Sequence, residues 1–263
     1  MFVAYIRWWV MAFFVKNGSV VRQIWGKGDT ILFIFAGASA EFALNKAVDW
    51  LYFTGRLPAD PLGRLFSTVA YARRIVFAPI AEAHEAIDAM NHIHAALEAS
   101  RGKAIPDWAY RDVLFMLIDY SIRSFEVLER KLTAAEKEEV FDVFLRVGIR
   151  MQLKGLPANF QQWQFMRNEH LQHDLAASHF TTDLYRQYRR HLGPIRYYLL
   201  LQTQILIAPQ RVKHLLKFRN TSLLTPLLAL YKISRKMSMD KLLKLLILPP
   251  AYKRQINDLD VVP

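Results

Sequence analysis

The first candidate for chemistry is a histidine on a regular apolar stripe of the sequence. The spacing of this stripe places its members on one face of an α-helix, with His94 directed toward the core. His92 lies about 160° away around the same helix. A neutral imidazole in an apolar pocket is suited to binding haem iron, and the alternative is a hydrogen-bonded core histidine. The stripe, between Pro79 and Ser100, consists of Ile80, Ala83, Ile87, Met90, His94 and Leu97.

Arg64 and Thr68 form a second candidate pair. They stand four residues apart, so they share one face of the helix expected between Asp60 and Phe77. An arginine at the edge of a core stripe can bind a carboxylate through two hydrogen bonds, and the propionates of haem are carboxylates. The alternative is a surface arginine whose stem lies on apolar side chains.

Two carboxylates are candidates for acid–base chemistry. Glu41 follows the apolar run from Phe33 to Ala40, and Asp49 comes two helical turns later. A carboxyl group in apolar surroundings has a raised pKa and can accept a proton during catalysis. The alternative is an ion pair of Glu41 with Lys46 or with an arginine of the next helix.

Glu169, His170 and His173 form a cluster of metal-ligating residue types. Di-iron helical bundles need two Glu-x-x-His pairs and two further glutamates. Here the spacing is Glu-x-x-x-His, and the sequence has no second pair. We therefore interpret this cluster as a solvated or hydrogen-bonded face of a helix.

The sequence contains no cysteine, and this excludes several kinds of site. Disulfides, thiolate zinc sites and iron–sulfur clusters all require cysteine. Covalent haem attached through C-x-x-C-H and thiolate-ligated haem are excluded for the same reason. Any haem must therefore be held without a covalent bond, and histidine is the favoured iron ligand.

The elements that position these residues are expected to be helices almost throughout, since no alternating pattern of a strand persists. The sequence therefore predicts an all-α protein. Helices are expected over 31–53 after a cap at Asp29 or Thr30, over 61–77 after Asp60, over 79–101, over 107–131, from the capping box Thr133–Glu136 to about residue 155, and from Asn159 to about residue 177.

The net charge of +12 is concentrated near the C-terminus. Residues 186–254 hold 15 Lys and Arg and one acid, Asp240. We expect apolar or amphipathic helices over 1–29, a core over 30–190, and a basic helical extension over 191–263. Basic amphipathic helices of this kind pack on the core or lie on an anionic membrane surface. Nucleic acid is not an expected partner, because no recognised binding fold accompanies the charge.

Neither a secretory signal nor a membrane span is expected. Arg7 interrupts the apolar residues 2–15, and no small-residue cleavage site follows them. The longest uncharged runs, Thr30–Ala40 and Tyr197–Gln210, fall short of the roughly 18 apolar residues of a span. We expect a cytoplasmic or peripheral membrane protein. A second candidate membrane anchor consists of Trp8, Trp9, Phe13 and Phe14.

An ordered set of segments resembles the catalytic domain shared by the fungal ER-bound oxygenase MpaB and the bacterial rubber oxygenases. The resemblance implies a globin-like helical core that holds haem b, with His94 as the proximal iron ligand and with Arg64 and Thr68 lining the haem site. It also implies oxidative cleavage of isoprenoid double bonds with dioxygen. The segments lie within roughly residues 30–170 and are Phe35–Ala43, Asp60–Thr68, Ile93–Leu97, Val113–Ser121 and Leu132–Glu136.

The sequence departs from the family pattern at two positions. Ser67 stands where rubber oxygenases carry a lysine, and Phe115 stands where relatives commonly have a histidine. Glu41 and Asp49 both compete for the position of the family's catalytic glutamate. The combined expectation is a single all-α domain that uses haem b and dioxygen to oxidise a lipophilic, unsaturated, isoprenoid-like substrate. The alternatives are a non-catalytic haem carrier or sensor, and a cofactor-free helical protein of the membrane surface.

Overall fold

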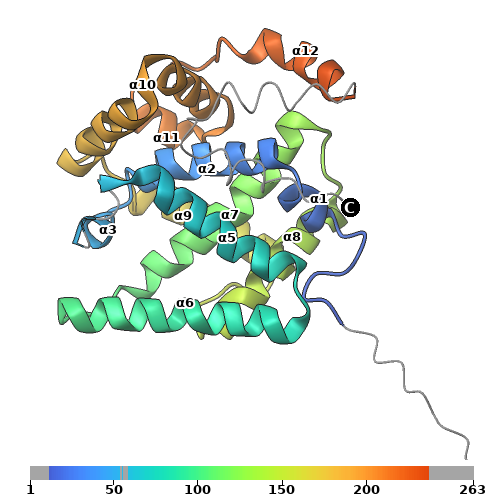
Figure 1. The fold of residues 1–263 in the computed structure, drawn as a ribbon, viewed down its shortest axis with the longest axis vertical. Coiled ribbons are helices and arrows are strands. Elements are labelled where there is room, and N and C mark those ends of the chain that lie inside the picture. Colours follow the sequence, from blue (N-terminus) through green and yellow to red (C-terminus); the bar gives the residue numbers. More distant parts are fainter. Residues whose placement is uncertain (1–11, 54, 56–58, 237–263) are drawn as a thin grey trace, which may run out of the picture.

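The chain folds into a single all-α domain, as the sequence predicts (Figure 1). The computed structural model describes residues 12–53, 55 and 59–236. Apart from helices, these residues contain two isolated β-bridges, Phe13–Pro79 and Asn45–Leu175. The helices are α1 (Val20–Trp25), α2 (Gly28–Phe42), α3 (Asp49–Phe53), α5 (Pro61–Phe77), α6 (Ile80–Arg101), α7 (Asp107–Leu128), α8 (Ala134–Arg150), α9 (Phe160–His173), α10 (His179–Ile207), α11 (Gln210–Leu215) and α12 (Thr225–Lys236).

Short-range signals in the sequence set the starts of several helices. The Asp60 carboxylate accepts a hydrogen bond from the Gly63 amide at 2.8 Å and caps α5. Thr133 and Glu136 form the expected capping box of α8, and the Asn159 side chain caps α9. Each cap satisfies backbone N–H groups that lack a partner within the helix, which confirms these three predicted starts.

The single helix expected over 31–53 is wrong. The structure instead has α2, which begins earlier, at Gly28, and α3, with a turn over residues 43–48 between them. In this turn the Asn45 side chain accepts a hydrogen bond from the Ala47 amide at 2.8 Å. The turn also pairs with the segment after α9, where the Ala176 amide donates to the Leu44 carbonyl at 2.8 Å. Contacts with a remote segment therefore end α2, although the apolar pattern continues.

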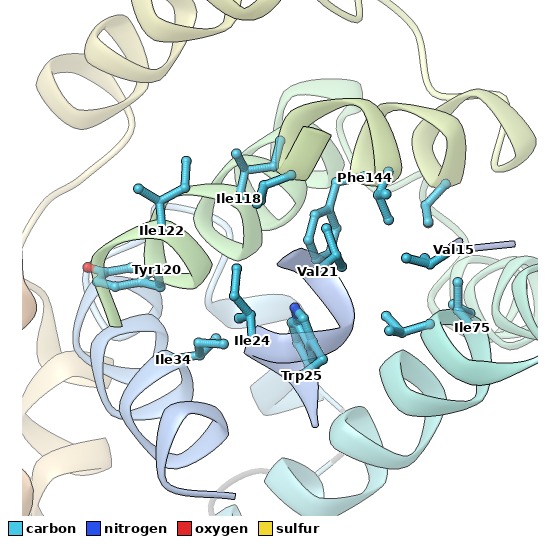
Figure 2. Close-up of a cluster of buried hydrophobic side chains, with 14 of the residues drawn as sticks. Val15, Val21, Ile24, Trp25, Ile34, Ile75, Ile118, Tyr120, Ile122 and Phe144 are labelled. Carbon is cyan, nitrogen blue, oxygen red and sulfur yellow. The ribbon is translucent and has the colours of Figure 1, made fainter. Parts of the chain in front are cut away.

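The centre of the hydrophobic core is Trp25, the last residue of α1 (Figure 2). Its indole N–H donates to the Ser121 hydroxyl at 3.2 Å, and its ring meets Phe35 edge-on with centroids 6.2 Å apart. Helices α2 and α7 pack closely, because a Cβ atom at Gly37 would come within 2.3 Å of the Tyr120 ring. The small residues of α2 thus permit the close approach to α7 on which the core depends.

Phe14 belongs to the core and is not available as a membrane anchor. It is 4% exposed, and the Arg146 guanidinium lies 4.5 Å from its ring centroid. Phe13 is half-buried, with the Arg22 guanidinium 4.6 Å from its ring centroid. Trp8 and Trp9, the remaining two expected anchor residues, lie outside the described residues, and so does the rest of the segment 1–11.

The described part of the basic extension packs against the core. Helix α10 runs across α2 (Figure 1) and changes direction at Gly193, where φ is 72°. The expected boundary between residues 190 and 191 falls within this helix. The Gln204 side chain donates to the Ser39 hydroxyl at 3.1 Å and fixes α10 on α2. Residues 237–263 lie outside the described residues. Among the described helices, none combines the length and the apolar character needed to cross a bilayer.

Candidate functional site: an apolar cavity beside a buried polar network

A cavity of about 920 Å³ lies between α2, α5, α6, α7, α8, α10 and α12. Its volume is near the upper end of the range of roughly 300–1,000 Å³ that is usual for ligand pockets. Most of its wall is apolar, and such a wall favours an apolar ligand over water. Examples of the apolar lining are Phe33, Phe42, Ile75, Met90, Leu117 and Leu200.

His94 lies on the wall of this cavity. Of the histidines in the described part of the chain, it alone lines the cavity. It is half-buried, and its ring packs edge-on against Tyr110 with centroids 5.1 Å apart. The apolar stripe therefore identified the histidine that faces the interior, although that interior is a cavity and not a filled core.

Ser67 and Thr68 of α5 also line the cavity, and Tyr71 lies one turn further along the same helix. The side chain of Arg64 lies outside the described residues, so its predicted role stays a prediction. A different arginine, Arg196 of α10, does line the cavity. Sequence reasoning missed it because it lies in a basic segment where no single charge stands out.

One carboxylate of the described residues, Asp29, lines the cavity. Asp29 is 5% exposed and accepts a hydrogen bond from the Tyr231 hydroxyl at 2.6 Å. This bond ties α12 to the first turn of α2. The sequence analysis treated Asp29 only as a helix cap, since Tyr231 is remote in the chain.

Glu41 and Asp49 lie away from the cavity and apart from each other. Asp49 forms an ion pair with Arg101 at 2.6 Å, and the Arg101 guanidinium covers the Trp50 ring at 4.1 Å. Glu41 is fully buried on the face of α2 that meets α7 and α9. The structure therefore places neither candidate acid–base residue on the cavity wall.

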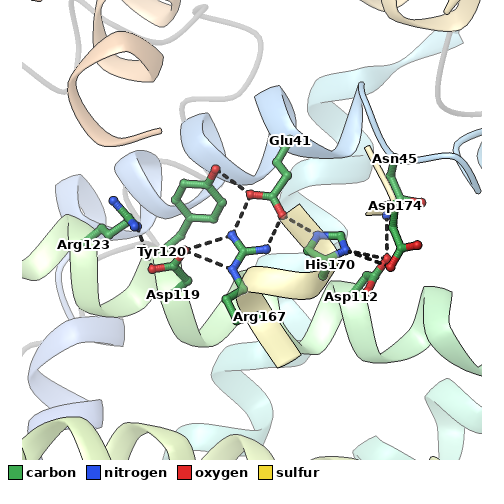
Figure 3. A network of polar contacts seen from close by, with 9 residues as sticks. All are labelled: Glu41, Asn45, Asp112, Asp119, Tyr120, Arg123, Arg167, His170 and Asp174. Atoms are coloured by element: carbon green, nitrogen blue, oxygen red, sulfur yellow. Dashed lines mark hydrogen bonds and ion pairs between the residues drawn. The ribbon is translucent and has the colours of Figure 1, made fainter. Parts of the chain in front are cut away.

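Glu41 is the centre of a buried polar network (Figure 3). The Arg167 guanidinium of α9 binds both of its carboxylate oxygens, through Nη1 at Oε1 and through Nη2 at Oε2, 2.7 Å away. The Tyr120 hydroxyl donates to the same Oε2 atom at 2.9 Å. Arg167 also donates to Asp119 at 2.9 Å, so one guanidinium joins α2, α7 and α9.

The charge of Arg167 decides the ionisation of Glu41. Burial by itself raises the pKa of this carboxyl, but the attraction and hydrogen bonds of Arg167 and His170 outweigh burial and lower it to about 2. The raised pKa expected for Glu41 is therefore wrong. Glu41 does form an ion pair, as the alternative interpretation held. Its partner is Arg167 of α9 and not Lys46 or an arginine of the next helix.

The structure is that of an all-α protein with a large, mostly apolar internal cavity. Residues 8–235 match the profile of the family described as the catalytic domain of the ER-bound oxygenase mpaB/B' and rubber oxygenase, and the chain belongs to this family. This confirms the resemblance seen in the sequence. No curated protein and no solved structure matches the chain. The family supports an oxygenase activity, with a small-molecule substrate and oxygen.

Replacing Arg167 with methionine is expected to lower the free energy of unfolding by about 3–5 kcal/mol, because it leaves buried carboxylates without their cation. The matched control is Arg150→Met, which breaks the exposed pair between Arg150 and Asp88 and should cost less than about 1 kcal/mol. Denaturant titration of both variants measures the difference. Equal losses in the two variants would contradict the central role of Arg167.

The lowered pKa of Glu41 predicts a specific loss of stability in acid. Ionised Glu41 stabilises the fold fully above the pKa of a free glutamate, about 4.3, and this contribution is lost as pH falls toward the folded value of about 2. The difference in unfolding free energy between the wild type and Glu41→Gln should therefore shrink between pH 5 and pH 2. A difference that stays constant across this range would contradict the ion pair.

Proposed function

We propose that this protein is a haem-b-dependent oxygenase that acts on a lipophilic, unsaturated substrate, with His94 as the axial iron ligand. The observation that carries the proposal is the position of His94, the one histidine of the described residues on the wall of a large apolar cavity. In a chain without cysteine, thiolate ligation of haem is excluded, and histidine, the proximal ligand of globins and peroxidases, is the favoured choice.

The residues of the cavity fit haem in size, polarity and charge. A volume of about 920 Å³ suits a large ligand, and the mostly apolar wall suits a porphyrin ring. The Nε atom of Arg196 is inaccessible to solvent and has no hydrogen-bond partner among the described residues. An arginine on the wall with a free donor is suited to a propionate carboxylate, and Arg64 is the second candidate for that role.

When bound, haem would supply the chemistry of dioxygen activation. The protein's own residues would hold the iron through His94, orient the substrate with Thr68 and Ser67, and exclude water with the apolar wall. Asp29 is the best-placed carboxylate for proton transfer, because it lines the cavity. Glu41 and Asp49 remain predicted acid–base residues, and a role for Glu41 would have to act through its partners.

The His94→Ala variant is expected to lose the Soret absorbance of bound haem, whereas His92→Ala should retain it. His92 is the matched control because it is exposed on the same helix, α6. The Arg196→Gln variant should bind haem more weakly but keep the same spectrum. Haem loss from the His92 variant together with retention by the His94 variant would overturn the assignment.

The same purified proteins also distinguish the proposed oxygenase from a haem carrier or sensor and from a cofactor-free protein. A haem carrier or sensor would show the Soret band without repeated turnover of an isoprenoid alkene under oxygen. A cofactor-free protein of the membrane surface would show no Soret band after reconstitution with hemin.

A lipophilic substrate also suggests delivery from an anionic membrane surface, and α12 is the candidate contact. Leu227 of α12 lines the cavity and is 52% exposed, and Leu223 just before this helix is 56% exposed. Lys232 is a basic residue of the same helix; it is half-buried, and its ammonium donates to the Glu129 carbonyl at 3.4 Å. A basic residue near an anionic surface contributes about 1 kcal/mol. An apolar edge of the cavity next to a basic segment suits entry from a bilayer.

Co-sedimentation should show binding to anionic vesicles that weakens in high salt, with little binding to neutral vesicles. The double variant Leu223→Ser, Leu227→Ser should bind less, whereas Ile149→Ser on α8, which is 59% exposed, serves as the matched control. Binding that is insensitive to salt and lipid charge would contradict the electrostatic part of this proposal.

A further inference from the structure

A second, smaller cavity of about 150 Å³ lies beside the buried network. Asp112 of α7, His170 of α9 and Asp174 just after α9 all line it. One ligand atom from each of these residues lies within 4.8 Å of the others. The His170 Nδ1 atom is 2.7 Å from a carboxylate oxygen of Asp112 and 3.6 Å from one of Asp174.

Nδ1 of His170 faces two carboxylates without a hydrogen bond of good geometry. His170 is 3% exposed, and its Nδ1 atom is inaccessible to solvent. Asp112 lies close to it, but among the described residues no group completes a hydrogen bond with Nδ1. If Nδ1 is protonated, it forms an ion pair with Asp112. If Nδ1 instead carries its lone pair, it faces carboxylate oxygens, and a cation bound between them removes the repulsion.

The other ring nitrogen is held as in known metal sites. Nε2 of His170 lies 2.8 Å from a carboxylate oxygen of Glu41. Metal-binding histidines usually donate their second ring N–H to a carboxylate, which fixes the tautomer and turns the free lone pair toward the metal. Asp112 is also supported, because the Asn45 side chain donates to it at 3.2 Å.

The net charge of the network is negative, and a divalent cation would balance it. Figure 3 contains four carboxylates, of Glu41, Asp112, Asp119 and Asp174, and two guanidiniums, of Arg123 and Arg167. With His170 neutral, as metal binding requires, four negative charges less two positive charges leave a net charge of −2, and a protonated His170 would make it −1. Arg111 also lines the small cavity, but its Nη1 atom donates to the Lys154 carbonyl at 2.8 Å.

We propose that Asp112, His170 and Asp174 bind a divalent transition-metal ion, with Zn²⁺ as the best fit. One imidazole nitrogen and two carboxylate oxygens form a mixed ligand set that suits Zn²⁺ better than Mg²⁺ or Ca²⁺. Zinc lies roughly 2.0–2.2 Å from such ligands, so two ligands of a tetrahedral site stand about 3.3–3.6 Å apart. The 3.6 Å separation between His170 Nδ1 and the Asp174 carboxylate fits this range. The 2.7 Å separation between Nδ1 and the Asp112 carboxylate is shorter, so the Asp112 carboxylate would have to move slightly away from the imidazole.

The small cavity supplies the remaining coordination position. Glu169 and His173 stand at its edge, exposed to solvent, with the His173 imidazole 3.5 Å from the Glu169 carboxylate. Water or one of these side chains can complete a tetrahedral site.

A metal at this position would connect the buried polar network to the wall of the large cavity. It would join α7 to the end of α9, and Asn45, which supports Asp112, also lines the large cavity. The metal would therefore fix one part of the wall of the ligand cavity. This inference does not rest on the binding of haem.

The test is titration of the full-length protein with Zn²⁺ by isothermal calorimetry, with metal content after dialysis measured separately for zinc and iron. We expect one Zn²⁺ per chain and an increase in the thermal midpoint. Asp112→Asn and Asp174→Asn should each weaken Zn²⁺ binding at least about 10-fold, since loss of a supporting residue alone typically costs 10–100-fold. Asp142→Asn, which alters an exposed carboxylate of α8, should leave binding unchanged.

Two results would overturn the proposal. The first is the absence of Zn²⁺ binding by the wild type, which would leave His170 as an imidazolium between Glu41 and Asp112. The second is retention of binding by both aspartate variants, which would place the ion elsewhere. Circular dichroism checks that the variants fold, and Asp174→Asn is the milder change because Asp174 is half-buried. The outcome is independent of the Soret measurement, so the two proposals can fail separately.

Discussion

The buried ion pair between Glu41 and Arg167 is the constraint on which the arrangement of the central helices depends. A charge removed from water is tolerated only where partners surround it, and Arg167 has Glu41 on one side and Asp119 on the other. These contacts hold α2, α7 and α9 in a single arrangement. A shift of any one of the three helices would leave a buried charge without its partner, so the network favours one packing over its alternatives.

Helix α2 separates two environments of opposite character. Its residues Phe33, Ser39 and Phe42 line the large apolar cavity, whereas Glu41 faces the polar network. The small residue Gly37 brings α7 close enough for the Tyr120 hydroxyl to reach Glu41. The cavity therefore has a rigid wall on this side, and Asn45 at the end of α2 takes part in both environments. Rigid support of this kind is what a ligand site needs if its contacts are to stay in register.

The family fits this division of the structure. The proposed oxygenase for an apolar substrate would need a large cavity that excludes water, and the mostly apolar wall, which also carries His94 and Asp29, suits that need. The polar network lies outside that cavity. The proposed function therefore places catalysis at the cavity and gives the network a positioning role, which the proposed metal ion would reinforce.

The sequence alone determined the features that depend on neighbouring residues. The caps at Asp60, Thr133 and Asn159 need only a side chain and an amide a few residues away, and the helical stripe that selected His94 repeats over less than one helix. The family resemblance was also readable, because ordered segments preserve it. Only the tertiary structure decided the partner of Glu41, which lies 126 residues away, and the end of α2, which depends on the segment after α9. It likewise brought Tyr231 to Asp29 and Asp112 to His170. These contacts depend on how the helices pack, and the spacing of residues within one helix does not specify which distant helix will lie against it.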